Sequence, residues 1–364
     1  MLGDISSTML RLPSSTGSLE GLKKSGESAV LSGGTTDIWR GVWNDKQVAF
    51  KAFRIYPSQD LLEAKKILWR LVPTWKRLTH ENVLPFYGVD TSLFQLALVY
   101  EWGQDGNIMQ YLESKPDASR SKLLLQVAKG LQYLHSLGVV HGELKGANVL
   151  ISRSGNARIC DYGLSPIISN PTFTVAATPG VAGPSRWLAP EIIDPPSGAG
   201  SDPPTASKPA DVFAFAMLAV EAFTGKVPFG NMKNESVVIQ IIRGRRPDKP
   251  LAADKLGLTV EMWKFVEKCW NQNPKKRPDI EKVVTAWEGF ANAEGNSTSM
   301  SKRGGRRSQF AQPSTVYNEE DAHKAPPLCF FLTFQCVRLV PVCVQPTWAL
   351  TIVGGTTFSS LLIT

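Results

Sequence analysis

Hydrophobic and polar residues alternate along the first part of the chain and then take up a helical period. Alternation over residues 37–43 and 47–53 predicts two strands, joined by a turn of Asn44, Asp45 and Lys46. Apolar residues three and four positions apart predict an amphipathic helix over residues 61–71, which Pro73 should end or kink because proline has no amide hydrogen. Two more short strands are expected at residues 83–87 and 95–100.

Beyond Gly106 the pattern is helical. Residues 121–137 are strongly amphipathic and end at Gly138, a residue suited to the left-handed cap of a helix. Residues 210–224 and 260–271 are also predicted to be helical. Strands and one helix, followed by several helices, indicate an α+β fold of two lobes. We expect a small β-sheet lobe over residues 28–102 and a larger, mainly α-helical lobe over residues 103–291.

The two ends of the chain differ from this central region. Residues 1–27 are rich in Ser, Gly and Thr and predict a disordered arm, and residues 292–327 predict a low-complexity linker. Residues 328–364 are apolar and contain no acidic residue; residues 339–364 are long enough to cross a membrane but are diluted by Thr, Ser, Gly, Gln and Pro. A disordered tail or an artefact of gene prediction is favoured, with a membrane anchor as the alternative.

The composition is that of a globular protein. Of the 364 residues, 43% are hydrophobic and 20% are charged, which allows a sizeable core. Part of the net charge of +8 lies in Lys302, Arg303, Arg306 and Arg307. A solvated basic tail is favoured there over attachment to nucleic acid or anionic lipid, so no nucleic-acid partner is expected. The five cysteines fit neither a zinc site nor a disulfide framework, and no secretory signal is visible, so we expect a cytoplasmic protein.

Four short motifs follow one another along the central region. They are Val48-Ala49-Phe50-Lys51, the stretch 141–148 with the sequence His-Gly-Glu-Leu-Lys-Gly-Ala-Asn, Asp161-Tyr162-Gly163 and Ala189-Pro190-Glu191. Together they resemble the signature motifs of protein kinases, and the resemblance covers roughly residues 28–291. Lys145, Trp187 and Cys269-Trp270 resemble the tyrosine-kinase-like group, whose members are mostly specific for serine and threonine. The resemblance implies a two-lobed kinase fold, ATP and Mg²⁺ as cofactors, and a protein substrate or signalling partner.

The resemblance also implies roles for the residues of the motifs. Lys51, at the end of a strand, would hold the α- and β-phosphates as a point charge, and Lys145 would contact the γ-phosphate. Asn148 and Asp161 offer the hard oxygen atoms that Mg²⁺ prefers, so they are the expected metal ligands. Glu143 stands where the family has its catalytic aspartate and completes the expected catalytic set.

Nucleotide contacts are expected from both lobes. Ile38, Ala49 and Leu150 are expected to pack against adenine, and the backbone around Glu101 and Gly103 to bind its edge.

The resemblance also assigns residues to the phosphate-covering loop, the gatekeeper position and the apolar spine. Gly33 and Gly34 would let the backbone of the covering loop come close to the phosphates. Tyr100 takes the gatekeeper position behind the adenine. Four side chains match the stacked apolar spine of the family: Trp75, Phe86, His141 and Tyr162.

Four departures from the family pattern concern ATP handling and phosphotransfer. Glu143 has one methylene more than aspartate, which moves the carboxylate by about 1 Å and can cost on the order of 100-fold in rate. Leu71 falls where the helix acid that pairs with Lys51 is expected, and Glu63 lies about 12 Å earlier along that helix. The other two departures are the loss of flanking glycines at Leu31 and Thr36 and of an arginine at Gly142.

The sequence therefore supports two hypotheses. One is an ATP-dependent serine/threonine kinase of reduced activity, since Lys51, Lys145, Asn148 and Asp161 are present and position 143 keeps a carboxylate. The other is a pseudokinase that acts as a nucleotide-binding or allosteric scaffold in signalling, because the four departures cluster on the nucleotide and the catalytic position.

Overall fold

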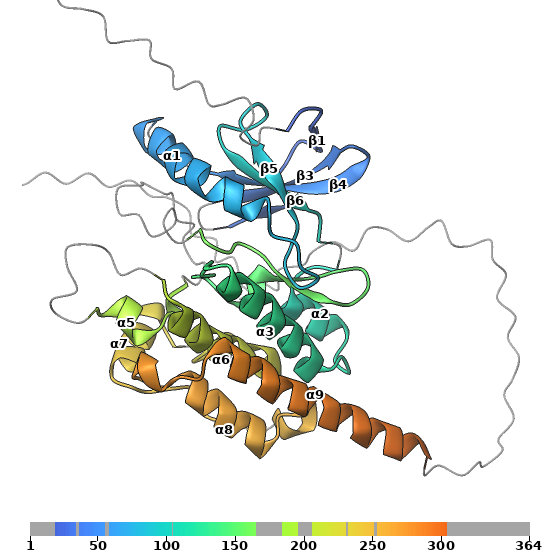
Figure 1. The fold of residues 1–364 in the computed structure, drawn as a ribbon, viewed down its shortest axis with the longest axis vertical. Helices are drawn as coiled ribbons and strands as arrows, with labels where there is room; N and C mark the ends of the chain where they lie inside the picture. The colour runs from blue at the N-terminus through green and yellow to red at the C-terminus, as the bar shows by residue number, and fades with distance from the viewer. Residues whose placement is uncertain are drawn as a thin grey trace, which may run out of the picture. The chain divides into compact units, whose positions relative to one another are not determined.

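The computed structural model describes residues 19–33, 36–54, 58–103, 105–164, 184–195, 206–230, 232–250 and 253–303. A β-sheet with one long helix comes first and a mainly helical lobe follows, so the expected two-lobed α+β fold is confirmed (Figure 1). The sheet strands run antiparallel in the order β1-β3-β4-β6-β5, with β2 paired to β3. Their bounds are β1 Lys23–Ser25, β2 Leu31–Ser32, β3 Thr36–Trp43, β4 Lys46–Phe53, β5 Phe86–Asp90 and β6 Ala97–Glu101.

The turn between β3 and β4 lies where the sequence predicts it. Trp43 pairs with Lys46, so only Asn44 and Asp45 form the loop. Both have positive φ, 48° and 61°, as a two-residue hairpin turn that follows the twist of its strands requires. The register that this turn fixes places Lys51 opposite Ile38, and the pairing of β4 with β6 places it opposite Leu98 on the other side.

Helix α1 (Ser58–Trp75) packs on the sheet through one apolar stripe. Ala64, Leu68, Val72 and Trp75 are all at most 2% exposed and follow the three- and four-residue spacing of a helix face. Of the two expected effects of Pro73, an end or a kink, the end does not occur at this residue, because α1 continues to Trp75. Proline in the last turn removes a single intrahelical hydrogen bond, and the buried indole of Trp75 holds that turn in place.

The other face of the sheet has its own small core. Val48, Phe50, Ala52, Ala97 and Val99 are buried there. The covering side chains are Leu19, Leu22, Trp39, Trp43, Tyr87 and Phe94.

The prediction of a disordered arm over residues 1–27 is corrected for residues 19–27, which contribute to the sheet and to its packing. Residues 19–27 are part of the described structure, and Lys23–Ser25 pairs with β3 as strand β1. Leu19 and Leu22 pack on the sheet, and the Lys24 ammonium lies 4.3 Å from the Trp39 ring centroid. Residues 1–18 lie outside the described part of the chain.

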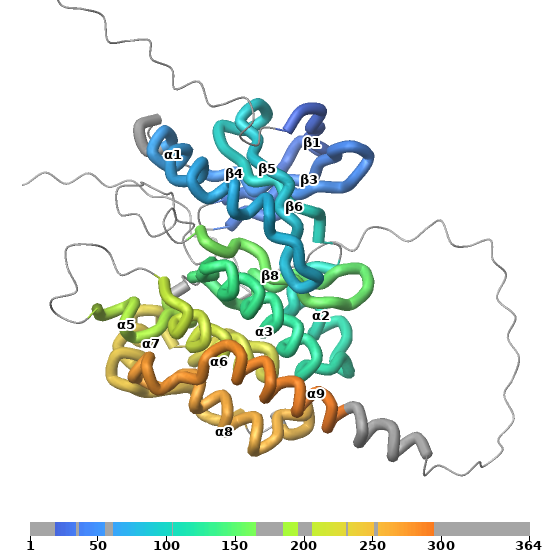
Figure 2. The backbone as a smooth tube through the Cα atoms, viewed as in Figure 1, coloured from blue at the N-terminus to red at the C-terminus, as the bar shows by residue number. Residues whose placement is uncertain are grey.

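The helical lobe is built around α6 (Lys208–Thr224), whose residues from Asp211 to Phe223 are all buried. It contacts α2, α3 and α8, and Figure 2 traces how these segments follow one another. The remaining bounds are α2 Ile108–Ser114, α3 Arg120–Ser136, β7 Val149–Ile151, β8 Ala157–Ile159, α5 Pro190–Ile193, α7 Asn234–Ile242, α8 Val260–Cys269 and α9 Ile280–Arg303. The helices predicted over 121–137, 210–224 and 260–271 are thus present, with ends shifted by one or two residues.

Helix α9 extends beyond residue 291, where the domain was expected to end. It packs along α3, and Ser119 Oγ donates a hydrogen bond of 2.7 Å to the Glu294 carboxylate. This hydrogen bond and the ion pair of Lys129 with Glu288, at 3.0 Å, attach the polar part of α9 to α3. Composition alone does not reveal these contacts. The rest of the predicted linker and the apolar tail, residues 304–364, lie outside the described residues. Among the described helices, none has both the length and the apolar character needed to cross a membrane.

Candidate active site

Lys51 and Asp161 meet between the two lobes. Strand β4 presents Lys51 from the sheet, and Asp161 follows β8 with a positive φ of 62°, so that its carboxylate lies 2.5 Å from the lysine Nζ. Burial works against the charge of Lys51, but the carboxylates of Asp161 and Glu143 raise its pKa. The expected phosphate-binding lysine is therefore kept protonated beside an expected metal ligand.

Among the side chains of α1 that the structure describes, none is an acid paired with Lys51. Glu63 pairs with Lys66 at 3.0 Å and its side chain is 53% exposed, while Leu71 packs against the core. Among the described residues, Asp161 is the ion-pair partner of Lys51.

Aromatic contacts of Trp75 hold the end of α1 in place. The Trp75 ring lies edge-on to both Phe86, at 5.6 Å between centroids, and Tyr162, at 6.2 Å. Phe86 also packs against Tyr100 at 5.3 Å, and the Tyr162 hydroxyl donates to the Leu84 carbonyl at 3.3 Å. The predicted stack of Trp75, Phe86 and Tyr162 is thus present. Tyr100, the expected gatekeeper, packs against its Phe86 end.

The loop that carries Glu143 is hydrogen-bonded to α6 through Asp211. The Asp211 carboxylate accepts hydrogen bonds of 2.8 Å from the amides of His141 and Gly142, and contacts His135 Nε2 at 2.8 Å. Gly142 has φ +79°, a conformation that glycine adopts without strain. The roles of Asp211 and His135 are not predicted by the sequence, because no local pattern places α3, α6 and this loop in contact.

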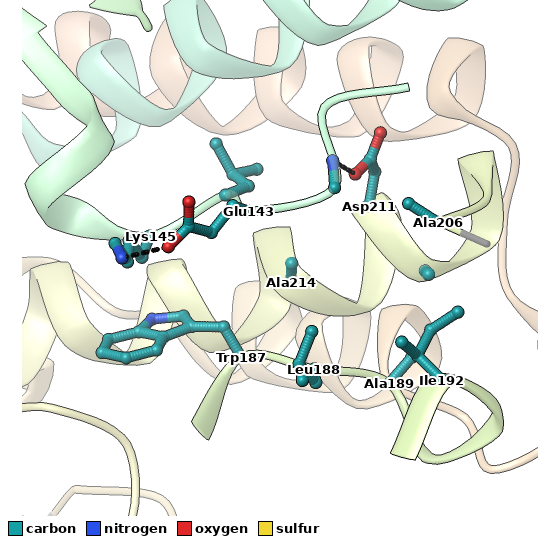
Figure 3. A pocket seen from close by; sticks show the side chains of 12 residues that line it. Glu143, Lys145, Trp187, Leu188, Ala189, Ile192, Ala206, Asp211 and Ala214 are labelled. Carbon is teal, nitrogen blue, oxygen red and sulfur yellow. Dashed lines mark hydrogen bonds and ion pairs between the residues drawn. The ribbon is translucent and has the colours of Figure 1, made fainter. Parts of the chain in front are cut away.

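Glu143 forms a compact unit with two of its neighbours. Its carboxylate lies 2.5 Å from Lys145 Nζ (Figure 3). Its backbone carbonyl accepts a 2.8 Å hydrogen bond from the side-chain amide of Asn148. Glu143 and Lys145 line a cavity of about 20 Å³ together with Trp187 and Leu188. Three of the four expected catalytic residues are therefore in mutual contact, and two of them, Glu143 and Lys145, line the cavity.

Asn148 and Asp161 lie next to each other because the Cys160 amide donates to the Asn148 carbonyl at 3.0 Å. The Asn148 amide nitrogen is used by Glu143, which leaves its side-chain oxygen with no hydrogen bond among the described residues. These two oxygen-bearing side chains fit Mg²⁺, which binds through one or two protein ligands and completes its shell with phosphate oxygens and water. The described residues contain no cluster of three or more His, Cys, Asp or Glu suited to a metal.

The predicted adenine site is built from β3, β4 and the segment that joins the lobes. Gly103 approaches Leu150 closely: a Cβ at position 103 would lie 2.9 Å from the Leu150 Cδ1 methyl, so the leucine side chain would have to shift. The Gly103 amide has no hydrogen-bond partner among the described residues and is free to meet a ligand. The Glu101 side chain pairs with Arg158 at 2.6 Å, which leaves only its backbone for adenine.

The expected phosphate-covering loop is described in part. The Gly33 amide donates to the Thr36 carbonyl at 2.8 Å, and the Arg54 guanidinium donates to the Gly33 carbonyl. Arg54 also lies 3.6 Å from the Asp37 carboxylate, so one side chain contacts both limbs of the loop. Gly34 lies outside the described residues.

Comparison with known families agrees with this geometry. The family model described as protein tyrosine and serine/threonine kinase matches residues 26–286, most of the chain. The chain belongs to the protein kinase family. The expected family is therefore confirmed on the region that carries Lys51, Glu143 and Asp161.

Several curated kinases resemble this kinase domain. The serine/threonine/tyrosine-protein kinase HT1 of Arabidopsis thaliana is 28% identical over 267 residues, which cover 71% of this chain and 64% of HT1. The serine/threonine-protein kinase CTR1 of the same plant is 29% identical, over 68% of this chain and 29% of CTR1. The probable serine/threonine-protein kinase DDB_G0267514 of Dictyostelium discoideum is 29% identical, over 71% of this chain and 27% of its own length. The kinase domain thus spans less than two thirds of each of these relatives.

Glu221 is a residue of the kinase domain that the sequence did not single out. It is 5% exposed on α6, and one of its carboxylate oxygens accepts from the Gly146 amide at 2.9 Å and from Trp187 Nε1 at 3.0 Å. Burial raises its pKa from 4.5 to about 7, against the lowering effect of these hydrogen bonds and of Lys145. The carboxylate thus joins Gly146, in the loop that carries Glu143, to Trp187 in the segment before α5.

We expect the stability of the kinase domain to fall as the pH rises through the pKa of Glu221. The native state holds this proton up to about pH 7, whereas the unfolded chain releases it near 4.5. Over that window the native state binds more protons, so stability decreases with pH by an amount on the order of 3 kcal/mol. Denaturant unfolding of Glu221→Gln between pH 5 and 8 should lack this decrease. Glu113→Gln, at an exposed acid on α2, should keep it; equal slopes in all three proteins would contradict the assignment.

Proposed function

We propose that this kinase domain transfers the γ-phosphate of ATP to serine or threonine hydroxyl groups of protein substrates, at a reduced rate. The observation that carries the proposal is the array of Lys51, Asp161, Asn148, Glu143 and Lys145, which joins both lobes through contacts of 3.0 Å or less. Most of the relatives' names are those of serine/threonine kinases. Because the chain covers only part of those relatives, the activity of the whole protein remains this proposal.

In this proposal each side chain has one task. Lys51 binds the α- and β-phosphates, and Lys145 neutralises charge that develops on the transferred phosphoryl group. Glu143 accepts the proton of the attacking hydroxyl as the new P–O bond forms and the bond to ADP breaks. Mg²⁺, held by Asn148 and Asp161, would neutralise the phosphates when bound.

Lys51 and Asp161 must separate, or share their ion pair with phosphate and metal, for nucleotide to enter between them. Position 71 of α1 holds a leucine, and Glu63, the acid of α1 whose side chain the structure describes, pairs with Lys66 instead of taking over the lysine charge. This favours slow turnover, and it is also the observation that supports the second candidate function, a scaffold that binds nucleotide without transferring phosphate.

We further propose a cytoplasmic location and a protein partner. Among the described residues Cys160 and Cys269 are free, buried thiols, and burial raises the pKa of Cys160 and Cys269. Such cysteines are unreactive core residues, which agrees with a reducing compartment.

The decisive experiment compares phosphotransfer and nucleotide binding in the same preparations. We expect the full chain to label a generic serine/threonine substrate with γ-phosphate and Asp161→Asn to reduce this to background. Asp117→Asn, which changes an exposed acid before α3, should leave the rate unchanged. Mg-ATP at millimolar concentration should raise the melting temperature of the native chain, because a ligand that binds the folded state stabilises it.

The combined outcomes separate the two candidate functions. Binding of Mg-ATP without any transfer above the Asp161→Asn background would support the scaffold. Absence of both transfer and a thermal shift would contradict both nucleotide-dependent functions.

A further inference from the structure

A large groove opens on the helical lobe, away from the residues assigned to the active site. Its volume is about 710 Å³, and it is bounded by the end of α6, the segment 226–232, the end of α7 and residues 243–250. None of the residues assigned above to ATP, metal or phosphotransfer lines it. The active site does not explain this groove.

The groove is strongly cationic. Five cations and one acid line it: Lys226, Arg243, Arg245, Arg246, Lys249 and Asp248. Lys249 is paired with Asp254 at 2.8 Å. Lys226, Arg243 and Arg245 are exposed and form no ion pair with another described residue. Three unpaired cations on one concave surface produce a positive potential that an anionic partner would neutralise.

Arg246 adds charge from beneath the groove. Its guanidinium lies 4.8 Å from the Phe213 ring centroid and donates to the Trp270 carbonyl and to Gln272, all neutral partners. Burial, together with the neighbouring Arg277, lowers its pKa to about 10, so it stays charged at physiological pH. The half-buried Arg246 therefore carries the same charge as the exposed cations of the groove.

Apolar side chains lie among these charges. Val227, Phe229 and Met232 line the groove, and Met232 is 39% exposed. Phe229 has φ +63°, which is unusual for a residue other than glycine and turns the chain sharply at this wall. Pro247 and Pro250 form part of the opposite wall. The surface thus suits an extended peptide with carboxylates on either side of an apolar anchor.

One wall is connected to the active site through Arg186. This arginine is 5% exposed and donates to the carbonyls of Pro228, at 2.8 Å, and of Met232. The next residue, Trp187, is hydrogen-bonded to Glu221, which in turn holds the Gly146 amide of the catalytic loop. A peptide seated in the groove would lie beside the segment that carries Trp187 and borders the cavity lined by Glu143 and Lys145.

We propose that this basic groove, lined by Lys226, Met232, Arg243, Arg245 and Arg246, docks an acidic peptide segment of a substrate or signalling partner. Charge complementarity selects the carboxylates, and the apolar residues Val227, Phe229 and Met232 receive one hydrophobic side chain. The site is separate from phosphotransfer and serves an active kinase and a scaffold alike.

The test measures binding of a fluorescein-labelled peptide, rich in Asp and Glu around a central Leu, to the full chain without nucleotide. We expect Arg243→Glu/Arg245→Glu to weaken binding by at least about tenfold, because two attractive contacts become repulsive. The matched control, Lys76→Glu/Arg77→Glu, makes the same charge change at exposed positions at the end of α1 and should bind like the native chain. Raising the salt concentration should weaken peptide binding by the native chain and make the affinities of the native and charge-reversed proteins more alike.

Several outcomes would overturn the proposal. They are no binding of the peptide, equal weakening by the control, or unchanged binding after reversal of Arg243 and Arg245. Stronger binding of single-stranded RNA or of phosphatidylserine vesicles at the same residues would also overturn it, in favour of another class of partner. Lys226→Glu, with its melting temperature recorded, guards against misfolding of the double variant. Since no nucleotide is present, the result does not depend on the phosphotransfer experiment.

Discussion

Glu143→Asp should raise the rate of phosphotransfer by about 100-fold, the gain expected when a misplaced catalytic group is moved back by about 1 Å. The Glu143 carboxylate contacts Lys145 Nζ at 2.5 Å. The backbone around Glu143 is held by two hydrogen bonds, from the Asn148 side chain to the Glu143 carbonyl and from the Gly142 amide to Asp211. The loop therefore has little freedom to compensate for the longer side chain. Aspartate on the same backbone withdraws the carboxylate and makes room for the acceptor hydroxyl.

The measurement is the initial rate at saturating Mg-ATP for the native chain, Glu143→Asp and Glu143→Gln. Glu143→Gln removes the proton acceptor at constant size and should lower the rate by a factor of about 100 or more. Glu63→Asp, which shortens an exposed acid on α1, is the matched control and should change nothing. If shortening at position 143 lowers the rate instead, the glutamate is the better-placed base and the proposal of reduced activity fails.

Arg277→Met should destabilise the domain by about 3–5 kcal/mol, as expected when one partner of a buried ion pair is removed. The Arg277 side chain is fully buried and forms two hydrogen bonds to Glu191, at 2.6 and 2.7 Å. It also donates to the carbonyls of Asn271 and Pro209, and its guanidinium lies 5.1 Å from the Phe213 ring centroid. Its loss leaves an acid and two carbonyls without their partner.

Chemical denaturation followed by far-ultraviolet circular dichroism gives the free energy of unfolding. Lys282→Met is the control, because the ion pair of Lys282 with Asp279 is largely exposed and should be worth at most about 1 kcal/mol. Adding Glu191→Leu to Arg277→Met should recover part of the lost stability, since the uncompensated buried charge is then gone. A loss below about 1 kcal/mol for Arg277→Met would show that solvent enters the pocket and replaces the arginine.

Most of the elements that carry the site could be predicted from the sequence, because their signals are local. The alternation around Lys51, the helical period before Gly138 and the order of the four motifs each depend on residues close together in the chain. The places where prediction failed depend on distant contacts. Lys23–Ser25 is a strand because β3 offers it an edge, and α9 reaches Arg303 while Glu294 is held by Ser119 on α3.

The site divides in the same way. Glu143, Lys145 and Asn148 could be assigned because they lie within one motif. Glu221 and His135 could not, since each contributes through a contact with a residue at least 34 positions away. The direct pairing of Lys51 with Asp161 was also not predicted: the absence of a helix acid can be read from Leu71, but the identity of the partner requires the packed lobes.

The packing of Trp75 on Phe86 and Tyr162 has a thermodynamic consequence for the placing of α1. An ion pair would make that placement sensitive to ionic strength and to the protonation of a carboxylate. Contacts between rings are barely affected by salt and instead weaken on cooling, because the burial of apolar surface is driven by entropy near room temperature. The placement of α1 against Phe86 and Tyr162 should therefore loosen in the cold and respond little to salt, the reverse of a helix placed by an ion pair.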